Sequence, residues 1–201
     1  EFICEKTAVE RIASAQTGKS QERSFFINDV GIVERQYQRW VRELPTVRPF
    51  YAVKCNPDEM LLRVLSSSGA GFDCASGAEM ASCLKIGVVP QDIIFANPIK
   101  NAADLRYAKQ NNILKMTFDN EAELYKIAEH HPQAELVIRL LPDDSGSLMR
   151  FGVKFGAPQP HVRALLETAK KLNLKVIGTS FHIGSGCFDA NKYESAIKMC
   201  R

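Results

Sequence analysis

Five polar side chains stand within or directly after short apolar runs, where they could take part in chemistry. They are Lys54, Asp73, Asn97, Arg139 and His182. Lys54 ends the run FYAVK, and a lysine amine at the end of a buried strand can act as a nucleophile. Asp73 in GFDCAS and Arg139 in ELVIRLL are charged groups among apolar neighbours, where such groups rarely lack a partner. Taken singly, Lys54 could extend into solvent, and the two charged residues could form a structural ion pair.

Two further features could complete a binding site. Glu79 lies in the first turns of a predicted helix, where the helix dipole favours a carboxylate, and capping alone could explain it. His182 precedes the turn 184–186, whose backbone N–H groups, with the Ser185 hydroxyl, suit an anion such as a phosphate. The imidazole could stack on a flat ligand or fill the core as an ordinary histidine.

A nucleophilic lysine, two carboxylates, an arginine, an imidazole and a phosphate-sized turn together suit pyridoxal 5′-phosphate (PLP). The lysine can hold the aldehyde of PLP as a Schiff base. A carboxylate beside the ring nitrogen keeps that nitrogen protonated, because an opposite charge nearby favours the charged form. The ring is then a better electron sink for the loss of a carboxylate.

The elements that would position these residues alternate along the chain. Apolar runs predict six buried strands, over 50–54, 71–75, 92–97, 115–119, 135–141 and 176–184. Helices are predicted over 58–68, 77–86, 101–110, 120–130, 160–172 and 189–200, with capping starts near Asp58 and Asn120. This alternation indicates an α/β fold with a parallel sheet, either an open doubly wound sheet or a (β/α)8 TIM-type barrel. Six strands cannot close such a barrel, so we expect an incomplete barrel of about six βα units or an open sheet.

Two segments depart from the regular alternation. Upstream, the run SFFINDV precedes a helix predicted over 31–44, and the two resemble an entry unit. Residues 141–160, LPDDSGSLMRFGVKFGAPQP, interrupt the spacing of the strands and are rich in Gly, Pro, Ser and Asp. We expect a functional surface loop there, near the strand ends.

Composition excludes several classes of protein. The 26 basic and 23 acidic residues are scattered, so no basic stripe indicates nucleic-acid binding. Neither an apolar run long enough to cross a membrane nor a signal sequence occurs, and no Cys or His pair has metal-ligand spacing. The six cysteines are Cys4, Cys55, Cys74, Cys83, Cys187 and Cys200. They form no C-x-x-C pair, which indicates free thiols in a reducing compartment, the cytoplasm by default.

The strings FYAVKCN, GFDCAS, IIFANPIK, VKFGA and SFHIGSGC, in this order, resemble the eukaryotic ornithine decarboxylases, PLP enzymes of the alanine-racemase-like barrel class. The likeness runs from about Ser24 to the end. It implies that Lys54 is the Schiff-base lysine, that His182 stacks on the ring, that Glu79 faces the pyridine nitrogen and that Ser185 contacts the phosphate.

The resemblance also implies that Asp73 and Arg139 line the site and that Lys154, in VKFG, acts across the interface of a homodimer with shared active sites. The implied domains are an N-terminal segment, 1–23, and a partial PLP-binding barrel, 24–201. The rest of the barrel and the C-terminal β domain, which binds the distal amine of the substrate, would lie outside this chain. The implied reaction is decarboxylation of L-ornithine to putrescine in polyamine biosynthesis, with the fragment inactive alone.

Two alternatives remain open. One is another enzyme on the same barrel: a lysine, arginine or diaminopimelate decarboxylase, or a racemase. The other is a non-catalytic protein, similar to the antizyme inhibitors, that binds an antizyme-type regulatory protein. Asp73, Asn97 and the unbroken segment 182–186 favour an enzyme, because they leave the cofactor-binding set whole.

Overall fold

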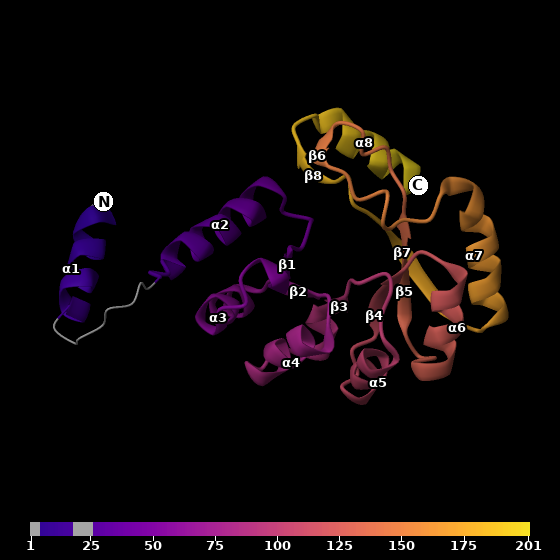
Figure 1. Cartoon of the computed structure of the whole chain (residues 1–201), viewed down its shortest axis with the longest axis horizontal. Helices are drawn as coiled ribbons and strands as arrows, with labels where there is room; N and C mark the ends of the chain where they lie inside the picture. Colours follow the sequence, from indigo (N-terminus) through magenta and orange to yellow (C-terminus); the bar gives the residue numbers. More distant parts are fainter. Residues whose placement is uncertain (1–4, 18–25) are drawn as a thin grey trace.

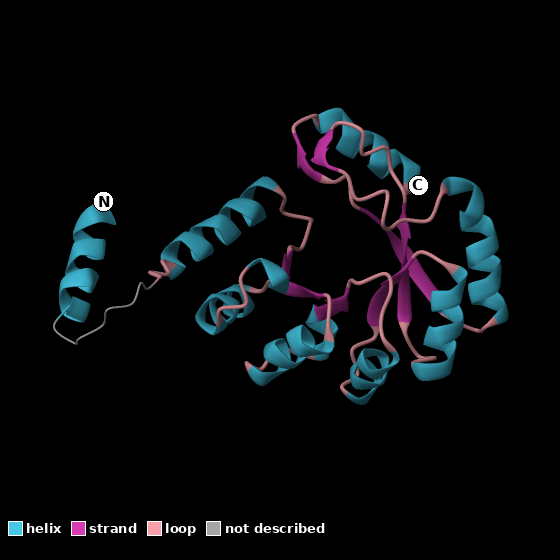
Figure 2. Ribbon diagram, viewed as in Figure 1, coloured by secondary structure: helices cyan, strands magenta, loops and turns pink. Residues whose placement is uncertain are grey.

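The computed structural model describes residues 5–17 and 26–201, and its main strands form an arc (Figure 1). The helices are α1 Glu5–Thr17, α2 Val30–Glu43, α3 Glu59–Ser68, α4 Gly77–Lys85, α5 Ala102–Gln110, α6 Glu121–His130, α7 Gln159–Lys171 and α8 Ala190–Met199. The strands are β1 Phe50–Ala52, β2 Gly71–Cys74, β3 Ile93–Phe95, β4 Lys115–Phe118, β5 Glu135–Leu140, β6 Ser147–Met149, β7 Lys175–Phe181 and β8 Ser185–Cys187. Figure 2 shows helices α3 to α7 along the outer side of the arc.

The main sheet has the order β1-β2-β3-β4-β5-β7, and every neighbouring pair is parallel. Each predicted strand is present, and the α/β class and the incomplete barrel are confirmed. The sheet ends at β1 on one side and at β7 on the other. Three strand predictions are wrong at their ends: β3 stops at Phe95 and β7 at Phe181. Strand β1 stops at Ala52, and Val53–Cys55 form a short 3-10 helix, η1. Lys54 therefore lies in a turn after the strand rather than within it.

Side-chain caps start four of the outer helices. Asp58, Ser76, Asn101 and Asn120 each accept a hydrogen bond from the backbone N–H three residues further on. Such caps satisfy N–H groups that have no partner within the helix. The predicted starts near Asp58 and Asn120 are confirmed, and the helix ends differ from the predictions by one residue or so.

Alternation along the strands separates the helix-covered face from the inner face of the arc. In β5, Ile138 and Leu140 are buried, whereas Arg139 between them is partly exposed. In β2, Phe72 and Cys74 are completely buried, and Asp73 between them is not. Because successive side chains of a strand point to opposite faces, Asp73 and Arg139 both face the inner side of the arc.

The expected surface loop over 141–160 contains structure that the sequence analysis missed. Strand β6 pairs antiparallel with β8, and the Ser147 hydroxyl donates to the carbonyl oxygen of Ile183. Further on, the segment around Ala157 returns to the end of β5, where Ala157 forms a parallel bridge with Leu140. The loop is thus tied at Ser147 to the segment after β7 and at Ala157 to the end of β5.

The upstream segment is only partly described. Residues 24 and 25 of SFFINDV lie outside the described residues, and Phe26 is fully exposed. The helix predicted over 31–44 is confirmed as α2. No helix in the described part of the chain is long and apolar enough to span a membrane.

Candidate active site

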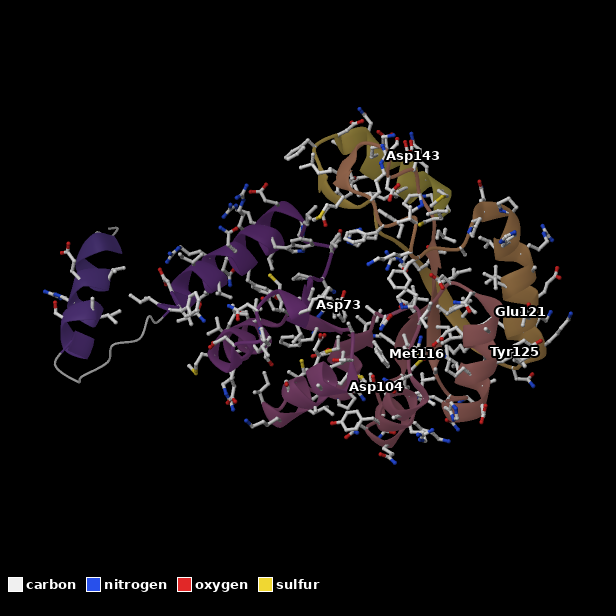
Figure 3. All side chains as sticks on the ribbon, in the orientation of Figure 1. Asp73, Asp104, Met116, Glu121, Tyr125 and Asp143 are labelled. Atoms are coloured by element: carbon white, nitrogen blue, oxygen red, sulfur yellow. The ribbon has the colours of Figure 1, made fainter. Side chains whose placement is uncertain are left out.

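Lys54 and Asp73 meet at the carboxyl ends of β1 and β2. The Nζ atom of Lys54 lies 3.9 Å from Oδ1 of Asp73, and the Lys54 side chain is 61% exposed. Ala52 and Asp73 are register partners, which brings the η1 turn next to Asp73. Figure 3 shows Asp73 on the inner side of the arc. The exposed amine can therefore be reached by a ligand from that side.

The carboxylate of Asp73 is only partly satisfied. Its Oδ1 atom is buried and accepts no hydrogen bond from the described residues. Burial raises the pKa of Asp73, and the nearby charge of Glu79 raises it further, whereas Lys54 and Arg139 oppose the shift. A buried carboxylate oxygen without a donor is costly, so this atom is suited to a ligand that brings a donor.

Glu79 is held at the start of α4 by two backbone contacts. The Ser76 hydroxyl accepts from the Glu79 N–H at 3.3 Å, and Oε2 of Glu79 accepts from the Ala75 N–H at 2.7 Å. This exchange is close to a capping box, so the capping explanation for Glu79 stands. Because Oε2 makes this bond, Oε1 is the oxygen that remains for a ligand.

Arg139 lies at the carboxyl end of β5 among aromatic and acidic neighbours. Its guanidinium carbon is 5.2 Å from the centre of the Phe155 ring. Burial lowers the pKa of Arg139, and the carboxylates of Asp119 and Asp73 oppose that shift. A planar guanidinium stacked on a ring keeps its donors in a fixed plane.

His182 follows β7, and a backbone hydrogen bond selects the tautomer of its ring. The Gly184 N–H donates to its Nδ1 atom at 2.9 Å, so the neutral ring carries its proton on Nε2. The Phe151 ring contacts the imidazole edge to face, with ring centres 4.9 Å apart. Burial lowers the pKa of His182, and the positive charges of Arg139 and Lys54 lower it further. Both effects favour the neutral form of the ring.

The charges of Lys54, Glu79 and Arg139 shift the pKa of Asp73, and those of Arg139 and Lys54 shift the pKa of His182. The structure thus brings these five residues together on one edge of the sheet, as expected from the sequence. Their donors, their acceptors and the buried Asp73 oxygen fit PLP chemically.

The other predicted residues make separate contacts. Ser185 is in β8, opposite Met149, and the Gly184 N–H of the expected phosphate turn is already bonded to His182. Lys154 is exposed in the turn after β6. Asn97 lies between β3 and α5, where its side-chain amide donates to the carbonyl oxygen of Ala75 at 3.3 Å.

Three residues near the site were not singled out from the sequence. Oδ2 of Asp119 accepts from the Gly156 N–H at 2.8 Å and so ties the long loop to the end of β4. Asp119 ends the apolar run KMTFD, which is the signal that marked Lys54, so it could have been found. Phe151 and Phe155 gave no such signal, because only the path of the loop brings their rings to His182 and Arg139.

Comparison with known proteins decides the family. The family described as pyridoxal-dependent decarboxylase, pyridoxal binding domain, matches residues 30–201. The chain belongs to this family. Its cofactor is PLP, and the arc of strands is the PLP-binding barrel domain of this family.

Among its relatives, this PLP-binding domain is 47% identical over 196 residues to a probable ornithine decarboxylase of Dictyostelium discoideum, covering 98% of the chain. It is also 46% identical over 193 residues to antizyme inhibitor 2 of Xenopus laevis, covering 96% of the chain. The solved arginine decarboxylase of Paramecium bursaria Chlorella virus superposes with a TM-score of 0.93 at 41% identity, over 96% of the chain. The domain spans 42% of each of the two relatives and 52% of the solved structure.

Proposed function

We propose that this domain is the lysine-bearing part of a longer enzyme that decarboxylates L-ornithine to putrescine. The observation that carries the proposal is the convergence of Lys54, Asp73, Arg139 and His182 on one strand edge in a PLP-binding domain. We take residues 24–201 as the partial barrel and 1–23 as a separate N-terminal segment.

Each residue of the group has a role in this proposal. Lys54 binds the cofactor aldehyde through its exposed amine, and Glu79 presents Oε1 to the ring nitrogen. His182 covers one face of the ring, and Ser185 contributes its hydroxyl to the phosphate. When bound, PLP supplies the electron sink for the carbon that loses its carboxylate.

Asp73 and Arg139 act beside the ring rather than on the phosphate. The buried Oδ1 of Asp73 accepts a hydrogen bond from the ligand, and it keeps the Lys54 ammonium near the carboxyl end of β2. Arg139, held flat by Phe155, balances the two carboxylates so that both can remain close together.

Ornithine is favoured over other basic amino acids by likeness, since the relative from Dictyostelium is a probable ornithine decarboxylase. Arginine is the first alternative substrate, because the arginine decarboxylase has a closely similar fold. Lysine and diaminopimelate follow. We further propose a cytoplasmic homodimer in which Lys154 acts across the interface, and that the 201-residue chain alone is inactive.

A non-catalytic role is the second candidate, favoured by the 46% identity to an antizyme inhibitor. Such a protein would bind a regulatory protein of the antizyme type instead of turning over an amino acid. The complete group around Lys54 favours the enzyme over this role.

The test is the absorbance of lysine-bound PLP, together with the release of carbon dioxide from ornithine, in the full-length protein that contains this domain. We expect Lys54→Ala to abolish both, because no other amine would bind the cofactor aldehyde. Lys109→Ala, at an exposed lysine of α5, is the matched control and should change neither. Cofactor absorbance that survives Lys54→Ala would refute the role of Lys54. Normal absorbance without turnover of any basic amino acid would favour the antizyme-inhibitor alternative.

A further inference from the structure

Lys100, in the run FANPIK, is a buried lysine with no role in the chemistry proposed above. Its side chain is 0% exposed, and the side chain of its ionic partner, Glu123 of α6, is 1% exposed. Lysine is among the residues that are least often fully buried, because removing the ammonium from water is costly. A fully buried lysine therefore needs contacts that compensate for the loss of water around its ammonium.

The ammonium of Lys100 has one acceptor for each of its three protons. Its Nζ donates to the carbonyl oxygen of Thr117 at 2.6 Å and to that of Asn97 at 3.2 Å, and it lies 2.9 Å from Oε1 of Glu123. An ammonium has three donors, so the group is saturated. It joins the carboxyl end of β4, the segment after β3 and the start of α6.

Neutralising Glu123 does not by itself explain this arrangement. Lys126 already pairs with Oε2 of Glu123 at 2.6 Å, and Lys126 is only partly buried, so it reaches the carboxylate at lower cost. Two of the three contacts of Lys100 are instead to backbone carbonyls. Both carbonyls belong to segments at the carboxyl edge of the sheet, where the candidate active site lies.

A chain of hydrogen bonds continues from Lys100 to Glu79. Lys100 fixes the backbone of Asn97, and the Asn97 amide donates to the carbonyl oxygen of Ala75 at 3.3 Å. The N–H of the same residue, Ala75, donates to Oε2 of Glu79 at 2.7 Å. The position of the Glu79 carboxylate is therefore set through Ala75 by the segment that Lys100 holds.

We propose that Lys100 is a positioning residue that holds the Glu79 carboxylate in place for the cofactor ring, acting through Asn97 and Ala75. This inference rests on the proposed function of Glu79. In this proposal Asn97 links Lys100 to Ala75 by hydrogen bonds and does not touch the cofactor.

The test uses the full-length protein and separates position from charge. Lys100→Met keeps the length of the side chain but leaves Glu123 less well paired, so we expect that variant to lose stability. The double variant Lys100→Met/Glu123→Gln removes both buried charges, and its thermal stability should return toward wild type. Its dissociation constant for PLP should still rise about tenfold, as is typical when groups that orient binding residues are lost.

Two further readouts distinguish positioning from general damage. The pH dependence of the bound-cofactor absorbance should shift in the same direction as in Glu79→Gln, because both variants weaken the contact at the ring nitrogen. Asn97→Ala breaks the chain without disturbing a buried charge, so it should reproduce the loss of PLP affinity even if the double variant does not fold. Lys115→Met is the control, since Lys115 donates to the carbonyl oxygen of Gln91 before β3, at the opposite edge of the sheet.

Three outcomes decide the inference. A double variant or Asn97→Ala protein that binds PLP with wild-type affinity and an unchanged pH profile would overturn it and leave the proposed function intact. Equal losses in Lys115→Met would also overturn it, because the effect would then be general. A wild-type protein that does not bind PLP would overturn the proposed function and this inference together.

Discussion

Asp73 is a carboxylate on a buried strand, and one of its oxygens has no hydrogen-bond donor among the described residues. Burial is the main cause that raises its pKa. For a carboxylate whose folded pKa is raised, the loss of stability begins as the pH rises through the unfolded value, about 3.9. It is complete above the folded value. At neutral pH the charged Asp73 carboxylate therefore lowers the stability of the cofactor-free protein.

Asp73→Asn should stabilise the cofactor-free protein and impair the proposed decarboxylation. We expect a gain of about 1 kcal/mol in the free energy of unfolding at neutral pH, because the charge is removed from a site without a donor. The contact with Lys54 offsets little of this gain, because it is 3.9 Å long and the Lys54 side chain is 61% exposed. Denaturant unfolding between pH 4 and pH 8 measures the effect, which should shrink as the pH falls. The control is Glu167→Gln, on the exposed face of α7.

A cofactor-free Asp73→Asn protein that is less stable than wild type at neutral pH would show that Asp73 makes a net favourable contact. Decarboxylation by the Asp73→Asn variant at the wild-type rate would show that Asp73 has no role in the reaction.

Sequence alone reveals those site residues that break a local pattern. Lys54, Asp73 and Arg139 interrupt or end apolar runs, and the structure brings them together. Phe155 could not be found this way, since an aromatic residue in a loop has many uses. Lys100 was missed for the opposite reason. A lysine after a strand suggests exposure, and its partners Thr117 and Glu123 lie 17 and 23 residues away.

Among the elements, the long loop after β5 has a tight turn at Gly156. Gly156 has a φ of +110°, and a Cβ atom there would lie 2.9 Å from the Cα of Leu141. Its N–H also donates to Asp119, which ties the loop to β4. Because Phe155 precedes this glycine, the same turn fixes the ring that packs on Arg139.

Gly156→Ala should therefore destabilise the protein by about 2 to 3 kcal/mol, the sum of a strained backbone and a backbone clash. Gly87→Ala is a matched control: Gly87 has a φ of +92°, but nothing lies within 4 Å of its would-be Cβ. That variant should lose only about 1 kcal/mol. Denaturant unfolding of both variants measures the difference. Equal losses would mean that the loop can shift away from β5 without cost.

The helices of the arc were predictable because their starts are encoded locally, by Asp58, Ser76, Asn101 and Asn120. Strands β6 and β8 were not, since each has three residues and exists only through its pairing with the other. The early end of β1 was missed because FYAVK is apolar up to Val53, and apolarity does not distinguish a strand from a buried 3-10 turn.

The molecule as a whole is an arc whose two edge strands differ in length. Strand β1 has three residues, whereas β7 has seven and exposes Ile177, Gly178 and Thr179. A long edge strand with free backbone groups is a template for pairing with another chain. The 201-residue chain, studied alone, should therefore associate through β7, independently of any dimerisation that depends on Lys154.

Ile177→Lys should reduce this association, because a charged side chain on an edge strand disfavours pairing with a second copy. Val89→Lys makes the same change at a residue that is 52% exposed and precedes the short helix η2, Pro90–Asp92, so it leaves the β7 edge intact. Sedimentation velocity over a range of concentrations should show a larger monomer fraction for Ile177→Lys only. Equal shifts in both variants would assign the association to apolar surface in general. A wild-type chain that stays monomeric throughout would show that β7 is protected, which would require the segments after β7 to cover its edge.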